Sequence, residues 1–168
     1  GRFKNSIRPP MKYFRDLDEN LEFYNEYKGK KIVTFCTGGI RCEPASAQLI
    51  AAGFNQDDLY QLDGGIIKYA ERYGDEGFFE GKCFVFDDRL ALDVDTTKNA
   101  IIVGECYHCK GETEEFYNCL NAKCNRLYLD CEACANKFSK TCSKECQNYI
   151  EDPSHMRSPR IKIAHRNK

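Results

Sequence analysis

The sequence predicts an α/β fold, a parallel sheet with helices on both faces, followed by a small zinc-binding module. Over the first 92 residues, short β-branched apolar runs alternate with helical patterns, which is typical of a parallel sheet covered by helices. Eight of the eleven cysteines then fall in four close pairs. Paired cysteines in a chain of cytosolic character are typical of metal ligands.

The first elements follow from periodicity and from turn residues. Apolar residues at helical spacing predict an amphipathic helix over 11–27. The β-branched, apolar segment 31–35 predicts a buried strand. A second helix is expected over 43–52, with Pro44 in its first turn and Gly53 after its end.

The later elements repeat the alternation of strand and helix. We expect a strand at 59–62, a helix at 66–73 that ends at Gly74, and a further strand at 83–86. Two confident sheet strands are few for a stable parallel sheet. We therefore expect a truncated domain, with further strand-forming residues upstream of residue 1.

Composition and charge divide the chain into four segments and argue against a membrane protein. We expect a sheet domain at 1–92, a polar linker at 93–104, a cysteine-rich module at 105–150 and a basic tail at 151–168. No apolar run approaches the ~20 residues of a bilayer span, and the first residues lack a secretory core, so no membrane association and a cytoplasmic location are expected. The tail is expected to be a solvated, disordered end or to add nonspecific affinity for RNA phosphates.

Cys36 lies at the C-terminal end of the strand predicted at 31–35, where open α/β sheets bind ligands. The Gly38-Gly39 turn leads into a helix, so loop N–H groups and the helix N-terminus are expected to surround an anion and lower the thiol pKa. Arg41 adds a positive charge. A buried small residue without chemistry is the alternative, but this position favours a nucleophile.

The active-site loop would consist of Cys36, Thr37, Gly38, Gly39, Ile40 and Arg41. It resembles the six-residue loop of rhodanese domains, in which the cysteine carries sulfur as a persulfide. Segment 62–66, with its Gly-Gly pair, resembles the entry to a later rhodanese helix. Related dual-specificity phosphatases have five residues between the cysteine and the arginine, whereas this loop has four, so the phosphatase reading is the weaker one.

Segments 36–43, 64–69 and 84–89, with the cysteine-rich region after them, narrow the resemblance to the tRNA uridine hydroxylase family. The resemblance implies a rhodanese-like fold and an oxygen-dependent conversion of the tRNA wobble uridine to 5-hydroxyuridine. It implies that Cys36 takes part, that tRNA is the partner and that molecular oxygen is the co-substrate.

Four further residues have a possible accessory role. Cys42, at the start of the following helix, either resolves an oxidised Cys36 as a disulfide or packs as a small residue. Asp87, Asp88 and Arg89 either close the active-site mouth or form a charged turn.

The metal-ligand candidates are the paired cysteines Cys106, Cys109, Cys119, Cys124, Cys131, Cys134, Cys142 and Cys146. Zinc prefers four thiolates, so eight cysteines predict two closed structural zinc sites. The spacing resembles interleaved RING, FYVE and MYND modules, which favours pairs one and three on one metal and pairs two and four on the other. Sequential pairing and an iron–sulfur cluster are the alternatives, and His108 is expected to be a bystander.

Three functions compete at this point. The first is a tRNA uridine hydroxylase that uses Cys36, and the second is a sulfurtransferase that carries persulfide sulfur to a thiol acceptor. The third is a zinc-dependent RNA- or protein-binding module with an inert rhodanese part. The intact loop argues against the third, and the resemblance favours the first over the second.

Overall fold

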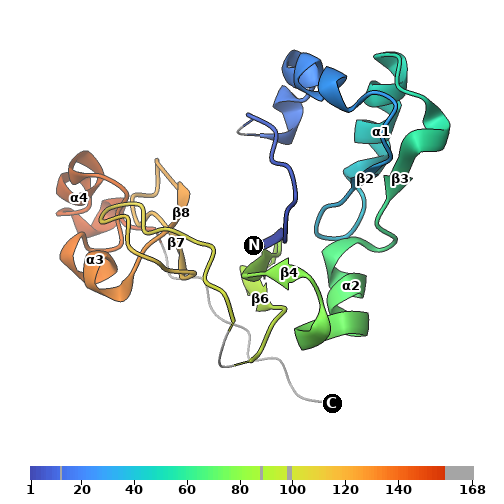
Figure 1. Cartoon of the computed structure of the whole chain (residues 1–168). Helices are drawn as coiled ribbons and strands as arrows, with labels where there is room; N and C mark the ends of the chain where they lie inside the picture. The colour runs from blue at the N-terminus through green and yellow to red at the C-terminus, as the bar shows by residue number, and fades with distance from the viewer. Residues whose placement is uncertain (12, 88, 98–99, 158–168) are drawn as a thin grey trace. The chain divides into compact units, whose positions relative to one another are not determined.

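The computed structural model describes residues 1–11, 13–87, 89–97 and 100–157, in two compact units (Figure 1). The described residues of Arg2–Phe79 and of 94–97 form the first, the α/β unit. Residue 1, the described residues of Glu80–Asp93 and residues 100–157 form the second, the cysteine unit. Asp88 and the tail from 158 to 168 lie outside the described residues.

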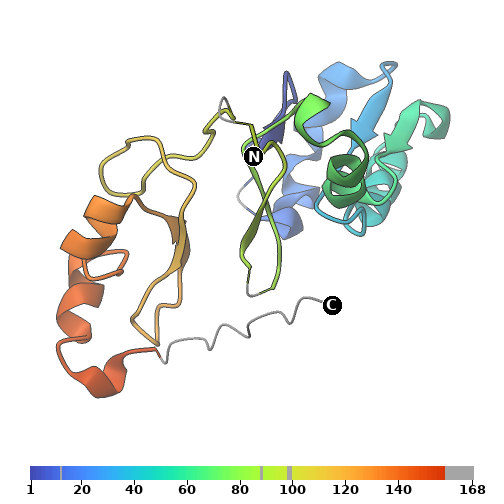
Figure 2. The ribbon, with the colours of Figure 1, turned by 90° about the horizontal axis from the view of Figure 1, so that it is seen from below.

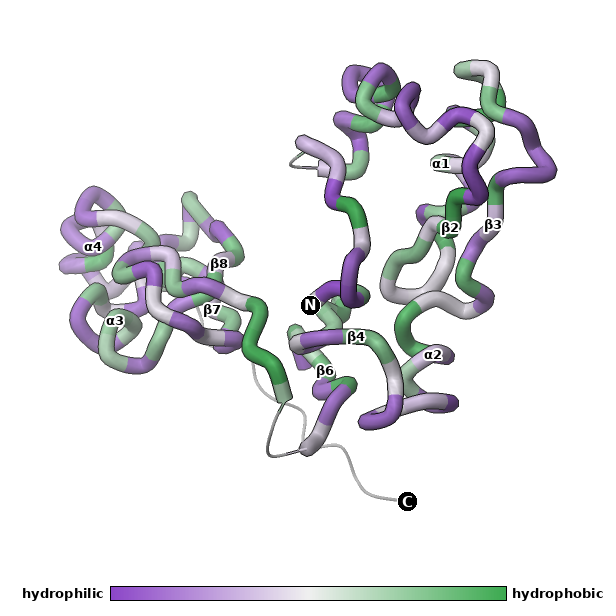
Figure 3. The backbone as a smooth tube through the Cα atoms, in the orientation of Figure 1, coloured by the Kyte–Doolittle hydropathy of each residue, from purple (hydrophilic) through white to green (hydrophobic). Residues whose placement is uncertain are grey.

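A strand–helix–strand motif forms the centre of the α/β unit. Strand β2 (Ile32–Thr34) pairs in parallel with β3 (Leu59–Gln61), with Val33 opposite Tyr60. Helix α1 (Cys42–Ala51) makes the crossover that a parallel pair requires, and α2 (Gly65–Tyr73) follows β3. Hydrophobic residues dominate β2 (Figure 3). The predicted parallel pair and both following helices are confirmed.

Helix α1 packs against both strands and buries Leu49, which is 1% exposed. Val33 and Tyr60 lie side by side across the strands and are 58% and 44% exposed. Successive strand residues point to opposite faces, so the face that carries Val33 and Tyr60 is largely exposed among the described residues, and helices on both faces stay a prediction.

The segment predicted as a helix over 11–27 forms two 3-10 helices, η1 (Phe14–Asp16) and η2 (Asp18–Tyr27). Their backbone bonds span three residues, as in the bond from the Leu17 N–H to the Phe14 carbonyl. No residue of η2 is buried. An amphipathic α-helix gains most of its stability by packing one apolar face against the rest of the protein. Because η2 buries no residue, the apolar periodicity of its sequence was not enough to make it an α-helix.

Short elements complete the α/β unit and join it to the next. They are β1 (Arg2–Phe3), η3 (Gln56–Asp58), η4 (Gly74–Glu76) and β4 (Phe79–Glu80). The Phe3 ring makes edge-on contacts with Phe35, Tyr69 and Phe79 at centroid distances of 4.8, 4.7 and 5.2 Å. This aromatic cluster anchors the backbone immediately before Cys36.

The described residues of the cysteine unit form antiparallel hairpins followed by short helices (Figures 1 and 2). Strand β5 (Lys82–Phe84) pairs with β6 (Ala91–Asp93), and β7 (Phe116–Asn118) pairs with β8 (Leu127–Leu129). Helices α3 (Glu132–Lys137) and α4 (Lys144–Tyr149) follow, and then η5 (Pro153–His155).

The β5–β6 hairpin belongs to the cysteine unit, which differs from the boundary expected at 93–104. The Lys82 N–H donates a hydrogen bond to the Glu114 side chain at 3.1 Å, and the Phe84 and Phe116 rings lie 5.5 Å apart. These contacts join residues more than 30 positions apart, so a local change in composition could not reveal them. Among the described helices, none is long and apolar enough to cross a membrane.

Candidate active site and metal centres

The Cys36 loop begins where β2 ends and is held by backbone hydrogen bonds on both sides. The Gly39 N–H donates to Cys36 Sγ at 3.1 Å, and the Cys42 N–H donates to the Gly39 carbonyl at 3.1 Å. On the other side, the Ile66 N–H donates to the Cys36 carbonyl at 3.0 Å and the Ile67 N–H to the Thr37 carbonyl at 3.1 Å. The first turn of α2, whose N–H groups lack intrahelical partners, therefore fixes the loop.

The environment of the Cys36 thiol favours its thiolate form. Partial burial raises its pKa, but hydrogen bonds from the backbone of Arg41, Gly38 and Gly39 and from the Cys42 side chain outweigh burial, so its pKa lies below the ordinary value. Burial raises the pKa of Cys42, and the nearby Cys36 adds to that effect. Cys36 is thus the more acidic of the two neighbouring thiols. This difference suits a pair in which Cys36 is the thiolate nucleophile and Cys42 keeps its proton.

The structure brings together the predicted loop residues, with two details that the sequence did not indicate. The backbone N–H of Arg41 is the largest single contribution that lowers the Cys36 pKa. Ile40 is 83% exposed, so this loop presents an apolar side chain to solvent. Cys42 is buried at the start of α1.

The sulfur atoms of the eight paired cysteines gather in two groups of four. Within each group the atoms lie within 4.8 Å of one another. The first group is Cys106, Cys109, Cys131 and Cys134, and the second is Cys119, Cys124, Cys142 and Cys146. Pairs one and three thus meet, and pairs two and four meet, which is the interleaved order favoured from the spacing.

Turns and helix starts supply the paired thiols. Cys106 and Cys109 lie in a turn in which the Cys109 N–H donates to Cys106 Sγ at 3.5 Å. Cys131 precedes α3 as its N-cap and Cys134 lies in its first turn. In the second group, Ser143 caps α4 and accepts a hydrogen bond from the Cys146 N–H. Each element can present two thiols to one point because the spacing within a pair is short.

The electrostatics of the first group fit a bound cation. A hydrogen bond from the Gly111 backbone and the neighbouring thiols lower the pKa of Cys109 to about 7. Burial and Asp130 raise the pKa of Cys106. Several thiolates this close repel one another unless a positive charge lies between them. The four-sulfur donor set therefore suits a tetrahedral, thiolate-binding metal ion.

Comparisons with known proteins found a family model that matches part of the chain and relatives that match most of it. A family model described as "Rhodanase C-terminal" matches residues 80–147, most of the cysteine unit. A protein of Cytophaga hutchinsonii named tRNA uridine(34) hydroxylase is 48% identical over 151 residues, which cover 90% of this chain and 47% of that protein. Along most of its length, the chain is similar to proteins named tRNA uridine(34) hydroxylase.

Two further proteins of that name show the same extent of similarity. The Protochlamydia amoebophila protein is 40% identical over 168 residues, which cover 98% of this chain and 48% of that protein. The Corynebacterium jeikeium protein is 42% identical over 150 residues, which cover 87% of this chain and 47% of that protein. The chain therefore spans about half the length of the curated relatives it matches. The comparison with solved structures found no match.

The segment at 84–89 contributed to the resemblance to the tRNA uridine hydroxylase family, and its described residues end β5 and lead toward β6. The Arg89 side chain donates two hydrogen bonds from Nε to the Asp87 carboxylate, at 2.9 and 3.1 Å, and the Arg89 N–H donates a third at 3.0 Å. These contacts agree with the charged-turn reading of Asp87 and Arg89. Asp88, the third predicted accessory residue here, lies outside the described residues.

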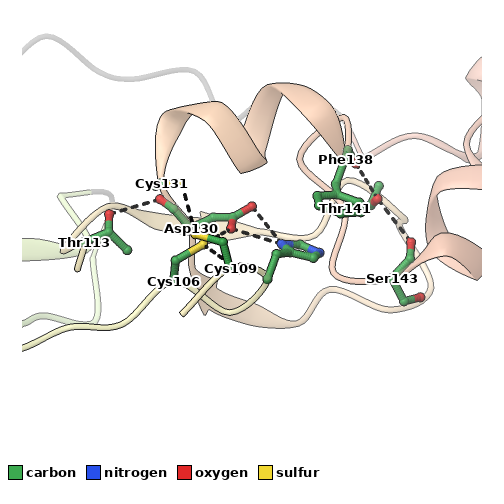
Figure 4. Close-up of polar contacts among 9 residues, drawn as sticks. Cys106, Cys109, Thr113, Asp130, Cys131, Phe138, Thr141 and Ser143 are labelled. Atoms are coloured by element: carbon green, nitrogen blue, oxygen red, sulfur yellow. Dashed lines mark hydrogen bonds and ion pairs between the residues drawn. The ribbon is translucent and has the colours of Figure 1, made fainter. Parts of the chain in front are cut away.

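Asp130 is a residue of the first metal centre that sequence reasoning missed (Figure 4). Its side chain is fully buried and accepts a hydrogen bond from the Cys106 thiol at 2.8 Å. His108 Nδ1 lies 3.0 Å from the same carboxylate, and the His108 ring stacks on Phe138 at 3.9 Å. His108 is therefore a close neighbour of the thiol group. The one signal in the sequence was the acidic residue directly before Cys131.

Gly65 is a residue of the thiol site whose role also was not predicted. Its φ is +65°, and a Cβ atom there would lie 2.4 Å from the Cys36 carbonyl oxygen and 2.7 Å from both the Gly39 nitrogen and the Thr37 carbonyl oxygen. Those atoms are backbone and cannot rotate away. Only glycine allows α2 to approach the Cys36 loop this closely.

We expect Gly65→Ala to displace the Cys36 loop, to slow alkylation of Cys36 and to lower the free energy of unfolding by more than about 2 kcal/mol. Gly29→Ala is the matched control, because Gly29 also has a positive φ, +78°, but nothing lies within 4 Å of its added Cβ. Alkylation kinetics and urea unfolding of both variants measure the difference. Equal losses in the two variants would show that the close approach is unimportant.

Proposed function

We propose that the protein takes part in the oxygen-dependent hydroxylation of the tRNA wobble uridine to 5-hydroxyuridine, with Cys36 as its reactive group. The observation that carries this proposal is the acidic Cys36 thiol inside a loop of N–H donors. The name tRNA uridine(34) hydroxylase of relatives up to 48% identical supports the substrate. At neutral pH the loop N–H groups favour an anionic sulfur over a neutral thiol, which makes Cys36 a nucleophile.

The two sulfur groups would hold two structural zinc ions. The ligands would be the four thiols of the first group and the four of the second. Four protein ligands leave no open coordination position for a substrate, so zinc would serve to hold the cysteine unit together. In the first site, Cys106 would give up the proton that it shares with Asp130 when it binds the metal, and the Asp130 carboxylate would keep its contact with His108.

Mass spectrometry of tRNA nucleosides tests the proposed reaction. Cells that lack the protein should lose 5-hydroxyuridine, and the full-length protein should restore it. Unchanged 5-hydroxyuridine in the deletion strain would contradict the proposal. If the deletion strain keeps its 5-hydroxyuridine but loses a persulfide transfer that depends on Cys36, the protein is instead a sulfurtransferase. The same loop supports this second candidate function.

Cys42 is proposed to resolve an oxidised Cys36. A peroxide converts the Cys36 thiolate to a sulfenic acid. Cys42 Sγ then attacks Cys36 Sγ, the S–S bond forms, and the sulfenic oxygen leaves as water with the Cys42 proton. The hydrogen bond between the two side chains supports this reaction.

After treatment with hydrogen peroxide, peptide mapping should find a Cys36–Cys42 disulfide in the unmodified protein. In Cys42→Ser, Cys36 should progress to sulfinic and sulfonic acids, because no thiol traps the sulfenic acid. Cys83→Ser is the control, since Cys83 is equally buried but lies in β5. If Cys42→Ser overoxidises no more than Cys83→Ser, Cys42 is a packing residue.

A further inference from the structure

A line of polar and basic side chains follows two loops of the cysteine unit and the segment after η5. It consists of Tyr107, Lys110, Asn125, Arg126 and Arg157, which we call the basic strip. Arg126 Nη1 donates a hydrogen bond to the Tyr107 hydroxyl at 2.8 Å, and the Arg126 guanidinium and the Lys110 ammonium each lie 5.7 Å from the centre of the Tyr107 ring. Arg157 donates a hydrogen bond to Asn125 Oδ1, which extends the line.

The strip is exposed except at the half-buried Arg157, and hydrogen bonds and ring contacts hold it in place. Tyr107 is 42% exposed, and residues 122–127 are all exposed. Yet the Tyr107 N–H donates to the Leu129 carbonyl at 2.8 Å, and its ring contacts the buried Tyr128 ring at 5.8 Å. Tyr107 also lies between the first pair of cysteines, and Asn125 directly follows the second. The loops therefore present these side chains in a preorganised arrangement.

The charged groups of the strip differ in their partners. Lys110 has an ion-pair partner, Glu105, at 3.5 Å. This pair is exposed and solvent-screened, so it exchanges readily for another anion. Arg126 and Arg157 donate within the strip to a neutral hydroxyl and a neutral amide, and the thiols of Cys124 and Cys142 also interact electrostatically with Arg126. Two guanidinium groups and one ammonium group thus remain able to bind further acceptors.

We infer that the basic strip is an RNA-binding surface that contacts phosphate groups, with the Tyr107 ring against a ribose or a base. Guanidinium groups bind phosphate oxygens with two parallel hydrogen bonds, and bound cations release the counterions of RNA. An aromatic ring among cations is typical of surfaces that bind single-stranded or looped RNA. The inference rests on the proposed function in one respect, which is that tRNA is the RNA partner. It does not depend on any reaction of Cys36.

Fluorescence anisotropy with a labelled tRNA, over a range of salt concentrations, tests the inference on the full-length protein. Arg126→Gln should weaken binding about 5-fold and reduce the slope of log affinity against log salt by about 1. Lys144→Gln is the matched control, because it removes the same charge from an exposed position of the same unit, where Lys144 contacts Gln147. The control should change affinity less than 2-fold.

Three outcomes would overturn the inference. These are equal affinities for Arg126→Gln and Lys144→Gln, an unchanged salt slope in Arg126→Gln, or displacement by polyglutamate as effective as by unlabelled tRNA. The last would assign the strip to an acidic protein partner. Lys110→Gln repeats the test from another loop if Arg126→Gln loses bound metal or its native circular dichroism. Cys36→Ser should bind tRNA normally, which separates this surface from the reaction.

Discussion

Cells whose sole copy of the protein carries Cys36→Ser are expected to contain as little 5-hydroxyuridine as cells that lack the protein. Serine nearly preserves the shape of the side chain but cannot form a thiolate at neutral pH. The N–H groups around Cys36 Sγ act on a charged sulfur, so the loss should be close to complete. Mass spectrometry of tRNA nucleosides measures the result.

Cys83→Ser is the control for this substitution, because it makes the same change at a thiol outside the loop. Metal content and thermal unfolding should be alike in the two variants and the unmodified protein. Because the Cys36 pKa is lowered, its thiolate persists at pH values at which an ordinary thiol is protonated. Its alkylation rate should therefore rise at a lower pH than that of a small-molecule thiol. Normal 5-hydroxyuridine in Cys36→Ser would refute the catalytic role.

The second large effect concerns the metal centres. We expect two zinc ions per chain, and we expect a strong chelator to unfold the cysteine unit. The buried core cluster of this unit consists of Cys119, Tyr128, Cys142 and Cys146, so most of its members are candidate ligands and metal coordination should supply much of the stability. Elemental analysis, with circular dichroism before and after chelation, measures both quantities. One zinc per chain, iron in place of zinc, or a folded unit after complete chelation would contradict the expectation.

Double substitutions test the interleaved order. Cys106→Ser and Cys131→Ser, alone or together, should each remove one zinc, because both thiols belong to the first group. Cys106→Ser combined with Cys119→Ser should remove two, because Cys119 belongs to the second group. Circular dichroism confirms that the remaining site is folded. Loss of two zinc ions from the Cys106–Cys131 pair in a folded protein would instead indicate sequential pairing.

The sequence by itself determined the features that depend on neighbouring residues. The apolar β2 segment, the Gly38-Gly39 turn and the start of α1 place Cys36 in a loop of N–H donors, because each is a local backbone preference. The short spacing within the cysteine pairs likewise identified the candidate metal ligands and favoured their interleaved order.

Only the tertiary structure decided which distant residues support these sites. The approach of α2 to the Cys36 carbonyl makes Gly65 necessary, and burial beside Cys106 gives Asp130 its role. The β5–β6 hairpin joined the cysteine unit, the helix predicted at 11–27 became two 3-10 helices, and one face of the β2–β3 sheet remained exposed. Each result depends on packing between segments far apart in the chain, and the free energy of that packing is not encoded in the pattern of any single segment.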